Sequence, residues 1–206
     1  ANQWDAAIEG FTKAGEVDPN QHVVWGNLAD SYVSRARATP ANRDADLTKA
    51  VEAYQKAIAI KGDDSAYHNN YALVLAQQKK FDEAQAELTK AAQIDPANAG
   101  KFYFNLGAVY VNTGNGDGAT AAFKKAIELD ANYAEAYYQY GLSMMGKATI
   151  ENGKTVAPAG TAEAFQKYMQ LSPNGPNAAT AKAMLDSMGA AVQTNFSQPA
   201  QQKKKQ

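Results

Sequence analysis

Small and bulky apolar residues recur in this chain at fixed spacings, and the pattern returns about every 34 residues. In one pattern, a small residue is followed four positions later by a bulky apolar residue and three positions after that by alanine. Its four copies are Ala7, Phe11 and Ala14; Ala50, Tyr54 and Ala57; Ala84, Leu88 and Ala91; and Ala119, Phe123 and Ala126. The leading alanines lie 43, 34 and 35 residues apart, so the chain contains an internal repeat, with one insertion between the first two of these alanines.

A second pattern alternates with the first and combines an aromatic, a large apolar, a small and another bulky residue. Its copies are Trp25, Leu28, Ala29 and Tyr32; His68, Tyr71, Ala72 and Leu75; Tyr103, Leu106, Gly107 and Tyr110; and Tyr137, Tyr140, Gly141 and Met144. Spacings of three, four and seven place the members on one face of a helix. Each repeat is therefore predicted to be two amphipathic helices that approach each other closely at the small residues.

The two patterns predict a lone first helix, four helix pairs and one closing helix. The lone helix covers residues 3–16, and the closing helix, residues 177–189, lacks the aromatic and glycine positions and is expected to cap the array. The pairs are expected at 21–36 with 44–60, 64–78 with 81–93, 99–113 with 116–129, and 133–147 with 159–170.

Together the patterns resemble the tetratricopeptide repeat family, including its bacterial members, over about residues 1–173. The family places a proline after the second helix, since proline supplies no backbone donor for a further turn. Three copies carry it, at Pro19, Pro96 and Pro173, and two depart from it, at Gly62 and Ala131. The resemblance implies an all-α, right-handed solenoid of two-helix repeats that presents a surface to other proteins.

On this reading a solenoid occupies residues 1–193 and a polar tail, residues 194–206, ends in three lysines. The solenoid divides into a half repeat at 1–20, repeats at 21–62, 63–97, 98–131 and 132–174, and a capping helix at 175–193.

Two insertions interrupt the period, each between the two helices of a pair. The first, residues 34–43, contains Arg35, Arg37, Pro40 and Arg43 and is expected to be a lengthened, solvated loop, with a basic contact patch as the alternative. The second, residues 147–160, contains Asn152 and Gly153, a strong signal for a two-residue hairpin turn. We therefore expect a small projecting β-hairpin.

Composition argues against several classes of function. The formal net charge of −1 gives no basic field for nucleic acid, and no run approaches the roughly 18 apolar residues that a membrane span needs. The chain has no cysteine, and its two histidines, His22 and His68, are far apart in sequence, so neither a metal cluster nor a nucleophile–base pair is indicated. The sequence thus predicts no enzyme, cofactor or metal. Low charge and abundant Asn, Gln and Tyr favour an exported, extracytoplasmic or extracellular protein without fixing the compartment.

In a two-helix solenoid the first helices of the pairs line the concave face. Each carries an amide beside its large apolar position: Asn27, Asn70, Asn105 and Gln139. In the family such amides often hydrogen-bond the backbone of a bound peptide, and the resemblance implies this here; the alternative is that they support local packing. Phe104 and Tyr138 would add an aromatic floor, with Lys101 nearby. Because the basic set that clamps a terminal carboxylate in some members is absent, apolar and amide contacts are expected to hold a ligand.

The two ends of the array suggest a different use. The first helix lacks a partner and would expose the apolar stripe of Trp4, Ile8 and Phe11, which is costly in water. The last helix carries a stripe of its own: Met184, Leu185 and Met188. A head-to-tail contact between copies of the chain would cover both stripes and propagate as a filament unless the rotation closed a ring.

The hairpin offers a further contact through Ile150 and Val156, because strand edges accept other strands. Trimming from a longer chain would leave the same unmatched first helix. Self-association into a structural assembly and capture of a segment of another protein in the groove therefore both remain open.

Overall fold

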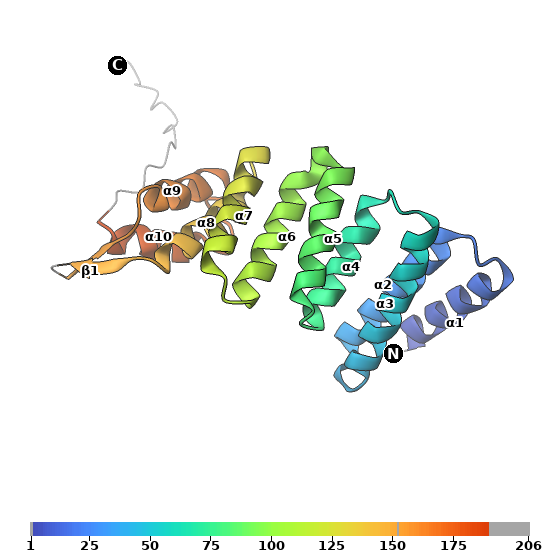
Figure 1. Ribbon diagram of the computed structural model, residues 1–206. Coiled ribbons are helices and arrows are strands. Elements are labelled where there is room, and N and C mark those ends of the chain that lie inside the picture. The colour runs from blue at the N-terminus through green and yellow to red at the C-terminus, as the bar shows by residue number, and fades with distance from the viewer. Residues whose placement is uncertain (1, 152, 190–206) are drawn as a thin grey trace, which may run out of the picture. The chain divides into compact units, whose positions relative to one another are not determined.

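Figure 1 shows the computed structural model, which describes residues 2–151 and 153–189. The described residues form helices, with one small two-stranded sheet, which confirms the predicted all-α fold built from two-helix repeats. The described residues divide into two compact units after Asp130, the first formed by residues 2–130 and the second by residues 131–151 and 153–189.

The first unit contains seven α-helices, each packed against the next one along the chain. They are α1 (Asn2–Val17), α2 (His22–Ala38), α3 (Arg43–Ile60), α4 (Ser65–Gln77), α5 (Phe81–Ile94), α6 (Ala99–Asn112) and α7 (Gly116–Leu129), with 3-10 turns η1 (Pro40–Asn42) and η2 (Pro96–Asn98). The closest pairings are α2 with α3, α4 with α5 and α6 with α7, as the repeat predicts. Helix α4 also contacts α6.

The core of the first unit lies where the repeated small residues face the repeated bulky ones. Ala50, Ala72 and Ala84 are fully buried. Gly107 of α6 lies against the ring of Phe123 of α7, so closely that a Cβ atom at Gly107 would lie 2.5 Å from the ring. The small residues are therefore steric requirements of the helix contacts.

The first insertion differs from the expected loop. Helix α2 continues through Ala38, one short 3-10 turn follows, and α3 begins at Arg43. The prediction of a loop over residues 34–43 was wrong because Ala36 is buried and Arg35 is anchored. The Arg35 guanidinium donates to both carboxylate oxygens of Asp46, at 2.9 and 2.6 Å, and to Asp5 of α1 at 2.6 Å. These bonds favour continuation of the helix over a solvated loop.

His68 fills the aromatic position of the second repeat as a buried polar side chain. Its Nδ1 lies 2.5 Å from Glu87 Oε2 on α5, and its Nε2 lies 3.1 Å from the carbonyl oxygen of Gly62. The ring therefore ties α4 to α5 and to the turn before α4, which compensates for the burial of a polar group at a packing position.

Two equivalent turns of the first unit differ in their chemistry. One turn joins α4 to α5 and consists of Gln78, Lys79 and Lys80, and the equivalent turn joins α6 to α7. In each of these two turns, the backbone N–H of the third residue donates to a carbonyl oxygen of the preceding helix at 2.9 Å. Lys79 adopts a left-handed φ of 62°, where the α6–α7 turn has Gly114 with φ 73°. Asn115 caps α7 through a bond from the Gly118 N–H, whereas the Lys80 side chain does not cap α5.

Replacing Lys79 by glycine is expected to raise the free energy of unfolding by about 0.5–1 kcal/mol, because glycine adopts a positive φ without steric cost. The reciprocal change, Gly114→Lys, is expected to lower it by a similar amount. Urea unfolding followed by tryptophan fluorescence measures both, since Trp4 and Trp25 lie in the first unit. A loss of stability in Lys79→Gly would contradict the strain assigned to this turn.

The second unit contains α8 (Ala134–Met145), strands β1 (Thr149–Glu151) and β2 (Lys154–Val156), α9 (Thr161–Leu171) and α10 (Ala178–Ser187). The strands pair antiparallel, with Thr149 opposite Val156 and Ile150 opposite Thr155, and Gly153 turns with φ 76°. The predicted hairpin is confirmed. Of its two-residue turn, Asn152 lies outside the described residues, as does the predicted tail from 194 on.

Helix α9 is the centre of the second unit, packed against both α8 and α10. A Cβ atom at Gly141 of α8 would lie 2.9 Å from the ring of Phe165 of α9, which repeats the contact of Gly107 with Phe123. Tyr168 is buried beside it, and its hydroxyl accepts a bond from the backbone N–H of Asn177 at 3.0 Å. This bond fixes the start of α10.

Candidate binding groove

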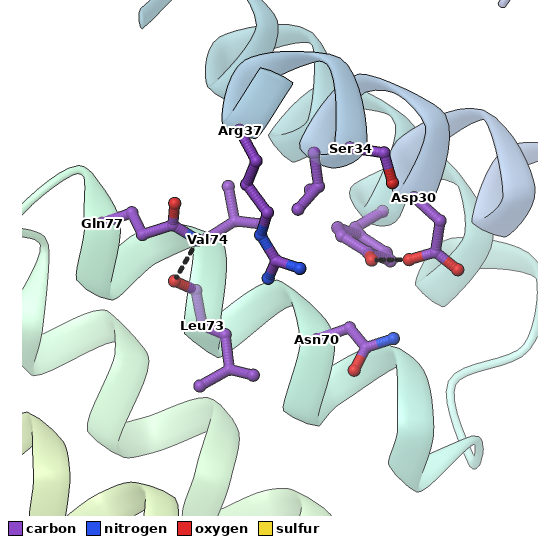
Figure 2. Close-up of a pocket in the computed structure, with 9 residues that line it drawn as sticks. Asp30, Ser34, Arg37, Asn70, Leu73, Val74 and Gln77 are labelled. Atoms are coloured by element: carbon purple, nitrogen blue, oxygen red, sulfur yellow. Dashed lines mark hydrogen bonds between the residues drawn. The ribbon is translucent and has the colours of Figure 1, made fainter. Parts of the chain in front are cut away.

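Two adjoining hollows of the first unit form a groove along α2, α4 and α6. The first, of about 240 Å³, is shown in Figure 2 and is lined by Asp30, Val33, Ser34, Arg37, Tyr54, Asn70, Leu73, Val74 and Gln77. The second, of about 480 Å³, is lined by Arg37, Leu73, Ala76, Gln77, Lys79, Phe81, Asn105, Ala108, Val109 and Asn112. Arg37, Leu73 and Gln77 line both hollows, so the groove is continuous across α4.

A buried tyrosine forms part of the wall of the first hollow. Tyr54 of α3 is only 1% exposed, and its hydroxyl donates to the carboxylate of Asp30 on α2. Burial raises the pKa of Tyr54 well above its usual value, and the hydrogen bond to Asp30 raises it further, whereas Asn70 opposes the shift. The hydroxyl therefore stays protonated at physiological pH and acts as a fixed donor.

Two of the predicted amides are brought together by a third that the pattern did not single out. Asn105 of α6 donates from Nδ2 to Oδ1 of Asn69 at 2.8 Å, and Asn69 donates from Nδ2 to Oδ1 of Asn70 at 3.0 Å. Asn69 directly precedes Asn70 and lies outside the repeated position. The sequence signal that could have identified it is therefore its place next to a predicted groove amide. Asn27 is exposed on α2. The amides of α4 and α6 thus form one connected network.

The other residues predicted for the groove have different surroundings. Phe104 of α6 is half-buried, with its ring centroid 5.5 Å from that of Phe123, and Lys101 is exposed in the first turn of α6. Gln139 and Tyr138 belong to α8 of the second unit. Tyr138 is buried against the rings of Phe165 and Tyr168, at centroid distances of 6.0 and 5.3 Å, and Gln139 donates to Glu135 at 3.2 Å. Tyr138 is therefore a core residue of its unit.

The residues predicted for self-association are covered to different degrees. On α1, Ile8 is only 8% exposed and Phe11 packs against the core of the first unit, while Trp4 is half-buried. On α10, Leu185 is fully buried in the core of the second unit, and Met184 of the same helix and Met188, which directly follows it, are partly buried against that core.

The hairpin is more open than either helix, because Ile150 is 79% and Val156 is 44% exposed. Val156 and Met188 line one hollow of about 330 Å³ with Pro158 and Gly160. The hairpin and the end of α10 therefore line the same hollow on the surface of the second unit.

The described residues offer neither a metal site of clustered acidic or histidine side chains nor a membrane-spanning helix. Within residues 2–151 and 153–189, no group of three or more acidic or histidine side chains is arranged to hold a metal ion. Among the helices in the same ranges, none combines the length and apolar character needed to cross a membrane.

The stacked helix pairs and the groove along their first helices define a helical-repeat protein. Residues 75–139 match the family model for the tetratricopeptide repeat. The crystal structure of MamA has the same fold, with a TM-score of 0.67 at 20% identity, over 84% of this chain and 90% of that one. The family match thus covers residues 75–139, and the likeness to MamA shows the same two-helix-repeat fold over most of the chain.

Two curated relatives are 32% identical to the chain. One is small glutamine-rich tetratricopeptide repeat-containing protein 2 of Mycosarcoma maydis, matched over 104 residues, and the other is heat shock protein STI1 of Saccharomyces cerevisiae, matched over 105 residues. Each alignment covers 50% of this chain, and they cover 29% and 17% of the relatives. The chain thus spans less than a third of the length of either relative.

Proposed function

We propose that this protein is a non-catalytic scaffold that holds a segment of a partner protein in the groove along α2, α4 and α6. The continuity of the two hollows through Arg37, Leu73 and Gln77 is the observation that carries the proposal. A continuous groove suits a polypeptide segment better than a compact small molecule, because successive residues of the segment can occupy successive hollows.

The groove offers both kinds of contact that a polypeptide requires. Leu73 and Ala108 provide apolar surface for side chains, and the Asn69–Asn70–Asn105 network and Gln77 provide amides that can both donate to and accept from a peptide backbone. The hydroxyl of Tyr54 is already bonded to Asp30 and holds its proton, so it is poorly suited to act as a base or nucleophile. This chemistry supports recognition over catalysis.

Selection of random short peptides on the immobilised 206-residue chain tests the groove. Peptides recovered in this way are expected to bind at least about tenfold more weakly to the double variant Asn70→Ala/Leu73→Ala, because both changes remove contacts from the groove. Affinity is measured by fluorescence anisotropy. Lys90→Gln on α5 is the control and is expected to leave the affinity unchanged, since Lys90 is exposed and does not line the groove. Failure to recover any peptide, or unchanged binding to the double variant, would rule out the groove.

A second use, self-association, is favoured by one observation, the exposure of Ile150 and Val156 on the hairpin. Burial of Ile8 and Leu185 within their own units leaves less apolar surface on α1 and α10 for such a contact than the repeat alone suggested. Sedimentation over a range of concentrations is expected to show particles above 22.0 kDa that return to monomers in Ile150→Ser. A monomer at every concentration would reject this use.

A further inference from the structure

Four basic side chains gather where the groove meets the turn between α4 and α5. Arg37 comes from the end of α2, Arg43 from the start of α3, and Lys79 and Lys80 from the turn. Gln77 connects them, because it lines both hollows of the groove with Arg37, accepts a bond from Arg43 Nη2 at 3.5 Å and lines a third hollow with both lysines. We call these four residues the basic cluster.

Arg37 occupies the centre of the groove. Figure 2 shows its side chain extending from α2 over the first hollow toward α4. Arg37 also lines the second hollow with Lys79, so its positive charge lies next to both hollows of the groove. The carboxylate in the first hollow, Asp30, accepts the hydroxyl of Tyr54.

The charges of the basic cluster are not neutralised by ion pairs. Five other basic residues of the first unit have carboxylate partners: Lys13 with Glu9, Arg35 with Asp5 and Asp46, Lys49 with Glu52, Lys61 with Asp63, and Lys125 with Glu128. Among its described residues, Lys56 lies over the ring of Trp25, and Lys90, Lys101 and Lys124 are single exposed cations outside the groove hollows. Within the described part of the chain, no member of the basic cluster forms such a pair, although all four are exposed and Asp44 lines the third hollow. The cluster therefore brings together four exposed cations without ion-pair partners, and Asp30 and Asp44 are the carboxylates that line the same hollows.

The turn that supplies the two lysines is built at a cost to stability. Lys79 is held at a left-handed φ, the Lys80 side chain leaves α5 uncapped, and the buried Oε1 of Gln78 has no hydrogen-bond partner. The equivalent turn avoids the first two costs with Gly114 and Asn115. Strain of this kind tends to persist where the side chains serve another purpose, and here both side chains carry a charge beside the groove.

We infer that the partner segment held by the groove is acidic, with aspartate or glutamate side chains that pair with the basic cluster. The inference rests on the proposed function and adds the chemistry of the partner. Exposed cations without partners gain from an incoming carboxylate without first losing an existing ion pair. The apolar and amide surface beyond Arg37 would then contact the rest of the segment.

The peptide selection described above also tests this inference. Selected peptides are expected to contain more aspartate and glutamate than the starting library, and their binding is expected to weaken as salt is raised. The double variant Lys79→Gly/Lys80→Asn copies the Gly114–Asn115 turn, and it should bind the selected acidic peptides about five- to tenfold more weakly. Its stability should rise, so a loss of affinity cannot be attributed to unfolding.

The matched control is Lys90→Gln/Lys124→Gln, which removes two positive charges from exposed positions on α5 and α7 and should retain wild-type affinity. Peptides without acidic enrichment, or acidic peptides that bind both double variants equally, would overturn the inference while leaving the proposed function standing. If no peptide is recovered, both the inference and the proposed function fail.

Discussion

Replacing Phe123 by alanine is expected to lower the free energy of unfolding of the first unit by about 3–5 kcal/mol. Phe123 is only 1% exposed, and its ring fills the space between Gly107 and Phe104 at the contact of α6 with α7. Truncation removes the buried ring and leaves a cavity that two packed helices can close only in part. Urea unfolding followed by tryptophan fluorescence measures the loss in the unit that contains both tryptophans.

The neighbouring change Lys124→Ala serves as the control, because Lys124 is exposed on the same helix and should shift stability by less than about 0.5 kcal/mol. Gly107→Val alone should also destabilise, since its side chain would enter the space of the ring. In the Phe123→Ala background the same valine is expected to cost less, because the cavity can accept it. A loss below about 1 kcal/mol in Phe123→Ala would contradict the close contact described for α6 and α7.

Breaking the pair of Arg35 with Asp46 is expected to cost about 3–5 kcal/mol when only one partner is removed. Asp46 is 2% exposed and accepts two bonds from the Arg35 guanidinium, so Arg35→Met leaves a buried carboxylate without its charge partner. Chemical denaturation measures the loss. By contrast, Asp5→Asn should change stability by less than about 1 kcal/mol, because the Asp5 side chain is half exposed.

The double variant Arg35→Met/Asp46→Leu distinguishes two contributions to the free energy of unfolding. One is the net stabilisation by the ion pair, and the other is the cost of leaving one buried charge unpaired. It is expected to recover most of the stability lost in Arg35→Met, since apolar residues of similar size can replace a buried ion pair. No recovery would show that geometry specific to the guanidinium, including its link to Asp5 on α1, stabilises this corner of the unit.

The repeat pattern was sufficient to predict the helices, because spacings of three, four and seven report directly on one helical face. The hairpin was equally predictable from the sequence, since Gly153 follows an asparagine between two short β-prone segments. The loop expected over residues 34–43 failed for a physical reason. Continuation of α2 depends on Arg35 contacting Asp46 of α3 and Asp5 of α1, and such distant contacts leave no local signal.

The groove was only partly predictable for a similar reason. The repeated amide positions led to Asn70 and Asn105, but Asn69, which joins them, lies outside the repeated position. Tyr138 follows the aromatic position of its repeat by one residue, and one residue turns a side chain by about 100° around a helix. The structure places its ring toward α9, between Phe165 and Tyr168. Periodicity thus identified the helices more reliably than it assigned individual side chains to a surface.

The contacts of Gly107 with Phe123 and of Gly141 with Phe165 restrict the order in which these positions can change during evolution. A larger residue at either glycine would first meet an aromatic ring, so its partner has to become smaller before or together with it. Aligned relatives of this chain should accordingly show linked substitutions at each pair, with loss of the glycine accompanied by loss of the phenylalanine.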